Sequence, residues 1–169
     1  GGLSIACFTT DTLIRMADGS EKAIEDVSVG EEVMSVKIPN LPDEDLGYNV
    51  WKTWESTDDM SNLEVTGATI ENMFFDYKEG YYNINNQLLK VTDEHPIWAY
   101  RNGKWTWCTA KELLVGDEVL NYKGENIKVD SISFIGGEVE VVNIDVEPLD
   151  VYFAGGVLVH NKGTDSDPG

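Results

Sequence analysis

The sequence predicts a single all-β domain, and three observations lead to this fold class. Short segments rich in Val, Ile, Tyr and Thr alternate with Gly and Pro along the chain, which is typical of sheets built from short strands. The dipeptide Asn102-Gly103 indicates a tight hairpin, because both residues can adopt positive φ. Only residues 21–27 and 109–114 carry the pattern of a short helical turn. The length of 169 residues suits one core rather than two.

Seven segments of the chain are expected to form strands. They are residues 32–38, 80–85, 87–92, 97–100, 118–122, 126–135 and 139–146. Between the first two, residues 39–62 are acidic and loop-like, and they are interpreted as an insertion. The segment after Asn161 lacks periodic apolar residues, and it is expected to be disordered.

An internal repeat suggests how the strands are arranged. Residues 24–34 and residues 110–120 share the pattern Val-Gly-acidic-Glu-Val, together with matching apolar positions before and after it. In each copy a helical turn precedes a glycine, and the glycine precedes a strand. The repeat predicts two halves related by a pseudo-two-fold axis.

The composition excludes several functional classes. The net charge of −19, from 31 acidic and 12 basic residues, disfavours nucleic acids and anionic membranes as partners. No apolar run approaches the roughly 20 residues that span a bilayer, and residues 1–6 do not resemble a signal peptide. We find no EF-hand loop. The two cysteines, Cys7 and Cys108, are too few for a zinc site or a disulfide framework, although they could pair. No metal and no cofactor are expected.

Three residues could act on the peptide bond between Ala6 and Cys7. The Cys7 thiol can attack the Ala6 carbonyl and move the acyl group from nitrogen to sulfur, which leaves a thioester. Thr92 can hold this bond by a hydrogen bond, and His95 can protonate the departing nitrogen, because the pKa of histidine lies near neutrality. Taken singly, Cys7 also fits a buried structural cysteine, and His95 also fits a turn residue.

A second pair of residues could break the peptide bond before Lys162. The side-chain amide of Asn161 can attack its own carbonyl carbon and form a succinimide, which releases the chain that follows. His160 is placed to polarise that carbonyl or to protonate the leaving amine. Because this cyclisation is slow in unfolded peptides, the fold must supply orientation. Taken singly, Asn161 also fits a surface residue after a strand.

These motifs together resemble one family. The segment Gly155-Gly156-Val-Leu-Val-His160-Asn161 resembles the C-terminal motif of inteins and bacterial intein-like domains. The segment from Cys7 to Gly19 resembles their N-terminal block, and Val91-Thr92-Asp-Glu-His95-Pro resembles their Thr-x-x-His block. The three motifs follow one another in the same order as in that family, and the resemblance covers nearly all of residues 7–161. The chain is therefore similar to A-type bacterial intein-like domains of the Hint (Hedgehog/intein) superfamily.

The resemblance implies a pseudo-symmetric horseshoe fold over residues 7–161, with flanks at 1–6 and 162–169. It implies a single-turnover domain that processes itself as a monomer, whose substrate is its own flanking polypeptides. Carried over by position, the catalytic residues are Cys7, Thr92, His95, His160 and Asn161, and Asp93 is a possible helper. The host protein would be bacterial, and localisation would follow that host, secreted or at the cell surface.

The sequence departs from the intein pattern in three places. Inteins are followed by Cys, Ser or Thr, whereas here Lys162 follows, whose side-chain pKa of about 10.4 makes it a poor nucleophile. Asn143 stands where inteins often have Asp, and it is a second possible helper; Asp150 stands where they often have His. Separate cleavage at the two ends is therefore expected, with partial splicing if the freed α-amine of Lys162 attacks the thioester.

Two alternatives remain open at this point. A Hedgehog-type domain cleaves only upstream and transfers the acyl group to a sterol, so the terminal His160-Asn161 argues against it. A non-catalytic β-rich module could instead bind a partner through Trp51, Trp54 and the acidic segment 39–62. Incubation of the chain separates these cases, because a binding module leaves its own backbone intact.

Overall fold

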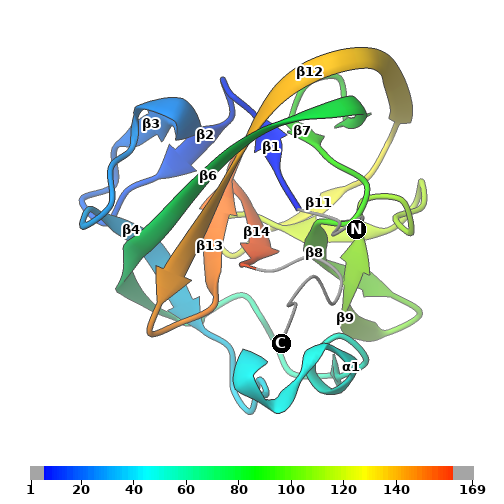
Figure 1. Cartoon of the computed structure of the whole chain (residues 1–169). Coiled ribbons are helices and arrows are strands. Elements are labelled where there is room, and N and C mark those ends of the chain that lie inside the picture. Colours follow the sequence, from blue (N-terminus) through cyan, green and yellow to red (C-terminus); the bar gives the residue numbers. More distant parts are fainter. Residues whose placement is uncertain (1–5, 162–169) are drawn as a thin grey trace.

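The computed structural model describes residues 6–161, and it shows an all-β fold (Figure 1). The helical elements are short: η1 (Ile24–Asp26), η2 (Glu44–Leu46) and α1 (Tyr48–Trp51). The strands are β1 (Phe8–Thr9), β2 (Leu13–Arg15), β3 (Glu21–Ala23), β4 (Glu32–Lys37), β5 (Glu55–Ser56), β6 (Glu64–Ile84), β7 (Leu89–Val91), β8 (Pro96–Arg101), β9 (Lys104–Thr109), β10 (Glu118–Leu120), β11 (Asn126–Lys128), β12 (Ile132–Glu147), β13 (Val151–Ala154) and β14 (Val157–His160).

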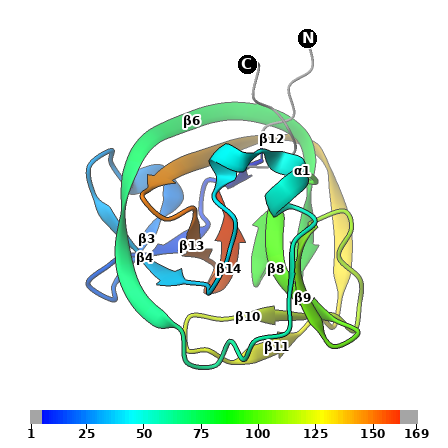
Figure 2. The ribbon, with the colours of Figure 1, turned by 90° about the horizontal axis from the view of Figure 1, so that it is seen from below.

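Two long strands, β6 and β12, form a curved antiparallel ribbon that wraps around the molecule (Figure 2). Their pairing runs from Ile132 opposite Ile84 to Glu147 opposite Thr69, with irregularities between Ile135 and Glu138 and between Asp145 and Val146. Because bulges bend a strand and increase its twist, these interruptions fit the curvature of the ribbon. The ribbon gives the molecule the expected horseshoe outline.

The strands form two sheets whose order brings distant segments together. The first sheet has the order β12-β1-β7-β6-β4, and the longest path through the second is β11-β10-β8-β14-β13-β2-β3, with β9 paired to β8 and β5 paired to β9. Strand β1 therefore lies between β12 and β7, while β14 lies between β8 and β13. As a result, the residues at both ends of the predicted domain lie in the interior of the fold.

The internal repeat corresponds to a repeated hydrogen-bonding pattern. The amide of Gly30 donates to the Ile70 carbonyl at 2.8 Å, and that of Gly116 donates to the Val129 carbonyl at 2.9 Å. Both glycines have positive φ, of 95° and 100°, which explains the residue type. In both copies an acidic side chain, of Glu31 and of Asp117, accepts a backbone N–H three residues earlier at 2.8 Å. The two copies of the repeat therefore share a local hydrogen-bonding pattern as well as a sequence pattern.

Buried apolar residues form two clusters. The first is built mainly from aliphatic residues, many of them on β6, β8, β12 and β14, and includes Phe8 of β1 and Val91 of β7. The second is rich in tryptophan and includes Trp51, Trp98 and Trp107. Residues of the predicted site lie where these clusters meet. No helix among residues 6–161 is long and apolar enough to cross a membrane.

Several predicted elements differ from the structure. The hairpin is confirmed, because Asn102 and Gly103 have φ of 53° and 79° between paired Arg101 and Lys104. Residues 64–79 were not expected to be a strand, yet they form most of β6, while 126–135 divides into β11 and the start of β12. Residues 109–114 contain the end of β9 and a turn at 110–112, without a helix. The segment 39–62 is not only loop, because it contains η2, α1 and β5.

Candidate active site

One turn links the two ends of the domain. Residues 92–95 join β7, which pairs with β1 through Val91 and Phe8, to β8, which pairs with β14 through Ile97 and Val159. The Thr-x-x-His segment therefore lies between the strand that follows Cys7 and the strand that carries His160. The predicted catalytic residues are all buried, with relative exposures of 0% or 1%.

Thr92 holds the backbone of Cys7 by three hydrogen bonds. The Cys7 amide donates to Thr92 Oγ1 at 2.8 Å, and the Cys7 carbonyl accepts from the Thr92 amide at 2.9 Å and from Thr92 Oγ1 at 3.1 Å. The peptide nitrogen between Ala6 and Cys7 is thus held by the hydroxyl group expected from the sequence. Burial raises the pKa of the Cys7 thiol to about 12, and Lys78 lowers it by a smaller amount.

His95 lies between the two ends of the domain. Its Nε2 is 2.9 Å from the His160 carbonyl oxygen, and its ring packs on Phe8 with centroids 4.2 Å apart. Burial lowers the pKa of His95 to about 3, although the carbonyl groups of His160 and Ala6 act in the opposite direction. The pKa near neutrality that the sequence led us to expect for His95 is wrong for the folded chain, because the imidazole is desolvated. The resting ring is neutral.

The side chain of Asn161 is held at both of its polar atoms. Its Oδ1 accepts from the Val146 amide at 2.8 Å, and its Nδ2 donates to the Val146 carbonyl at 2.7 Å. Its own backbone amide donates to the Asp150 carbonyl at 2.7 Å. A single backbone segment, the end of β12 and the loop after it, therefore fixes the residue expected to cyclise.

An aromatic and acidic enclosure surrounds His160. Its ring stacks on Trp51 with centroids 3.7 Å apart and an interplanar angle of 2°, and Trp107 approaches it edge-on at 5.1 Å. Ligand-type atoms of Glu44, Asp150 and His160 lie within 4.8 Å of one another. Carboxylates and imidazoles are common zinc ligands, so these three residues could hold a cation. The expectation that the chain binds no metal therefore stays a prediction.

Asp150 is the acidic residue found where inteins often have histidine. Burial raises the pKa of its carboxyl to about 7, and nearby Glu147, Asp43 and Asp45 raise it further, while the Glu44 amide, donating at 3.3 Å to Oδ2, lowers it. Its carboxyl group can therefore gain or lose a proton near neutral pH, a property that histidine would also have.

Asn143 and Asp93, the two possible helper residues, lie in different surroundings. Phe8 pairs with Val142 and Thr9 with Val141, so the register continues to set Cys7 opposite Asn143. The Asn143 side chain is buried, and its Oδ1 has no hydrogen-bond partner among the described residues. For Asp93, by contrast, only the backbone carbonyl makes a hydrogen bond in the described part of the chain, with the Lys111 amide. The geometry favours Asn143 over Asp93 as a neighbour of Cys7.

Sequence reasoning missed three residues that lie near this centre: Trp51, Glu44 and Tyr152. Trp51 and Glu44 come from the segment interpreted as an insertion, and no local pattern assigned them to the site. The Tyr152 ring lies edge-on to Phe8 at 6.3 Å, and its buried hydroxyl has no hydrogen-bond partner among the described residues.

The two cysteines do not form a disulfide with each other, because Cys7 and Cys108 are both free.

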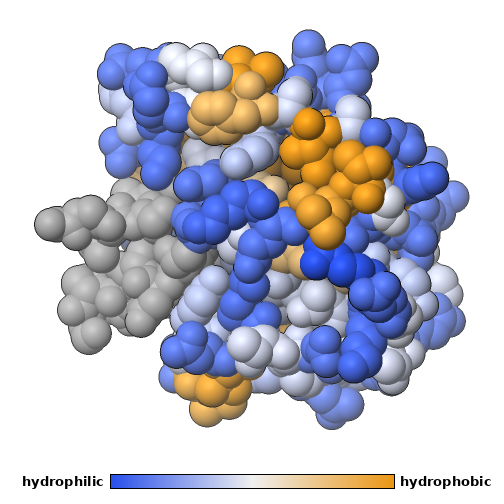
Figure 3. All heavy atoms as spheres, turned by 90° about the vertical axis from the view of Figure 1, so that its right-hand side faces the viewer, coloured by the Kyte–Doolittle hydropathy of each residue, from blue (hydrophilic) through white to orange (hydrophobic). Residues whose placement is uncertain are grey.

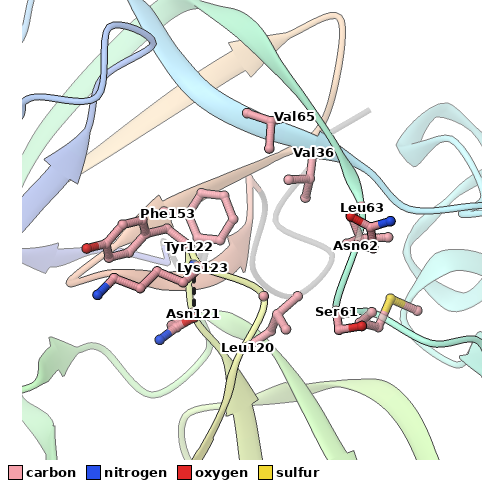
Figure 4. A pocket seen from close by; sticks show the side chains of 12 residues that line it. Val36, Ser61, Asn62, Leu63, Val65, Leu120, Asn121, Tyr122, Lys123 and Phe153 are labelled. Carbon is pink, nitrogen blue, oxygen red and sulfur yellow. Dashed lines mark hydrogen bonds between the residues drawn. The ribbon is translucent and has the colours of Figure 1, made fainter.

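Surface features lie apart from this centre. A pocket between the ends of β4 and β10 is lined by Val36, Leu120, Tyr122 and Phe153 among others, and none of the predicted catalytic residues lines it (Figure 4). The face seen in Figure 3 is largely hydrophilic with separate apolar patches. Exposed apolar residues on the β6–β12 ribbon include Phe75 and Phe134.

Comparison with known proteins identifies relatives of the whole fold. The family model described as Pretoxin HINT domain matches residues 13–164. The solution structure of a bacterial intein-like domain from Clostridium thermocellum is 22% identical, covers 94% of this chain and all of that one, and has a TM-score of 0.71. The DnaB intein from Synechocystis is 19% identical, with 93% and 99% coverage and a TM-score of 0.66. Reverse gyrase from Methanocaldococcus jannaschii is 25% identical over 135 residues, which are 76% of this chain and 7% of that protein.

Proposed function

The chain belongs to the Pretoxin HINT domain family, and from this premise we propose that it cleaves its own backbone at Ala6–Cys7 and at Asn161–Lys162. Self-processing in general is what the Hint/intein fold supports. The observation that carries the specific proposal is the position of His95, whose ring contacts the His160 carbonyl while the Thr92 hydroxyl in the same turn holds the Cys7 amide. One turn thus contacts Cys7 at the upstream site and the residue before Asn161 at the downstream site.

At the upstream site the thiol proton must move to nitrogen. Cys7 Sγ forms a bond to the Ala6 carbonyl carbon, the C–N bond breaks, and the proton lost from sulfur ends on the Cys7 amine. With its proton on Nε2, His95 donates to the His160 carbonyl, and its buried Nδ1, which has no partner among the described residues, is left as the base. Thr92 Oγ1 holds the leaving nitrogen throughout.

At the downstream site the Asn161 amide must turn onto its own carbonyl carbon. Nδ2 forms the C–N bond of the succinimide, the bond to Lys162 breaks, and the proton released from Nδ2 passes to the leaving amine. The Val146 carbonyl accepts from Nδ2 at 2.7 Å, which increases the electron density on that nitrogen. His160 is the nearby acid for the leaving amine.

Cleavage rather than complete splicing is the expected main outcome. Lys162 offers no thiol or hydroxyl to accept the acyl chain, so the thioester is open to water or to an added thiol. A minor ligated product would form if the freed α-amine of Lys162 attacked it. Release of whatever follows Asn161 would suit a host of the kind that the family description calls a pretoxin.

The test is to follow the intact mass of the purified chain at neutral pH, with and without dithiothreitol. We expect thiol to accelerate cleavage after Ala6 and residues 162–169 to be lost independently of thiol. Cys7→Ala should abolish only the first event and Asn161→Ala only the second. Cys108→Ala is the matched control, because Cys108 is also buried and free. An unchanged mass after days would reject self-processing and favour the binding module.

A further inference from the structure

The segment 39–62 supplies one wall of the centre around His160. Trp51 ends α1 and is 1% exposed. Its indole lies flat on the imidazole, with centroids 3.7 Å apart and planes inclined by 2°. Figure 2 shows α1 on the side of the molecule towards which β14 runs. A residue far away in the sequence therefore covers one face of the imidazole that precedes Asn161.

The indole is itself held from two sides. Tyr48 meets it edge-on at 5.1 Å, and Trp107 meets it edge-on at 6.4 Å. Trp107 also meets the His160 ring edge-on at 5.1 Å. Trp51 thus restricts the plane of the imidazole, and Trp107 restricts rotation of the ring within that plane.

The stack acts on the side chain of His160, whereas other contacts hold its main chain. The His160 carbonyl is bound to His95, and the following amide, that of Asn161, donates to the Asp150 carbonyl at 2.7 Å. The main chain is therefore fixed on both sides, and the Trp51 indole is one of the groups that set the direction of the ring. Reactions that need an oriented acid lose rate steeply when such a group is misplaced.

We propose that Trp51 is a positioning residue for the C-terminal step: its indole holds the imidazole of His160 in the orientation in which the ring acts on the bond after Asn161. The inference rests on the proposed function, and it gives the acidic segment a role in that function. Glu44, from the same segment, lies with Asp150 beside the ring. The stack itself is with Trp51 alone among the residues of this segment.

A matched control comes from the same segment. Trp54 stacks on Trp98, with centroids 5.8 Å apart and planes inclined by 11°, and it makes no ring contact with His160 among the described residues. Substitution of Trp54 by Leu removes an aromatic side chain of equal size that is partly buried and packs against the same tryptophan cluster. It therefore reports general loosening of the segment, whereas Trp51→Leu also removes the stack.

The experiment measures both cleavage rates in one incubation with dithiothreitol, in the full chain and in Trp51→Leu, Trp51→Phe and Trp54→Leu. Because an aromatic pair is worth a modest free energy beyond its buried area, we expect Trp51→Leu to slow loss of residues 162–169 by about 2- to 10-fold. Cleavage after Ala6 should keep its rate, and Trp51→Phe, which retains a flat ring, should restore much of the C-terminal rate.

A spectroscopic measurement supports the kinetics. In the Asn161→Ala chain, which cannot cyclise, the His160 ring protons should be shifted upfield by the indole and should move downfield in Trp51→Leu but not in Trp54→Leu. An unchanged C-terminal rate, or equal slowing of both steps, would overturn this inference while leaving self-processing intact. A parent chain that never cleaves would instead overturn the proposed function, and this inference with it.

Discussion

Removal of the imidazole of His95 should change how stability depends on pH. Its folded-state pKa of about 3 lies below the ordinary value of 6.5, so the unfolded chain binds a proton on acidification before the folded chain does. The contribution of His95 to the free energy of unfolding is therefore fully present above pH 6.5 and is lost as the pH falls towards 3. Between pH 7 and pH 4.5 the loss amounts to about 2.5 kcal/mol, from 1.36 kcal/mol per pKa unit.

The assay is urea unfolding at pH 7, 5.5 and 4.5 in a chain carrying Cys7→Ala and Asn161→Ala, which prevents processing. The same chain with His95→Gln is compared with it. The substitution will lower stability at pH 7, because it disturbs a packed site, so the informative quantity is the difference between the two pH profiles. Other groups, including Asp150, titrate in both chains, so their contributions cancel in the difference between the two profiles. Parallel profiles for the two chains would refute the assignment of a buried neutral imidazole.

Three further predictions concern other groups. Because the pKa of Asp150 is raised to about 7, its ionisation destabilises the fold as pH rises, so Asp150→Asn should stabilise the inactive chain more at pH 8 than at pH 5, by on the order of 2 kcal/mol in urea unfolding. Thr92→Val, which removes the Oγ1 bonds to Cys7, should slow thiol-induced cleavage by roughly 5- to 100-fold without slowing C-terminal cleavage, as intact mass would show. Gly116→Ala, at φ of 100°, should cost about 1–2 kcal/mol of unfolding free energy, whereas Gly136→Ala, with no neighbour closer than 4.0 Å, should cost less.

The fold class and the symmetry could be predicted because they depend on local patterns. The repeat around Gly30 and Gly116 requires a positive φ and an acidic partner, and both requirements are visible in the sequence. The length of β6 could not be predicted in the same way. Residues such as Phe74 and Phe75 are exposed in succession on the ribbon, so the alternation that indicates a half-buried strand is absent from that part of the chain.

Candidate catalytic residues could be named from the sequence because cysteine and histidine are rare in this chain and stand in short motifs. His95 and His160 are the only two histidines in the sequence, and the structure brings both to one centre. Their surroundings could not be predicted, because burial and stacking depend on segments far apart in the chain. Trp51 lies more than one hundred residues before His160 in the sequence, and only the folded chain stacks the two rings.

Burial of this centre should slow the proposed upstream step. It raises the pKa of the Cys7 thiol to about 12 and lowers that of His95 to about 3, because both charged forms are desolvated. In the resting geometry, proton transfer from sulfur to the imidazole is therefore uphill. Slow self-processing is therefore expected at the upstream site. Any change that admits water or a positive charge beside Cys7 should accelerate it, because either would stabilise the thiolate.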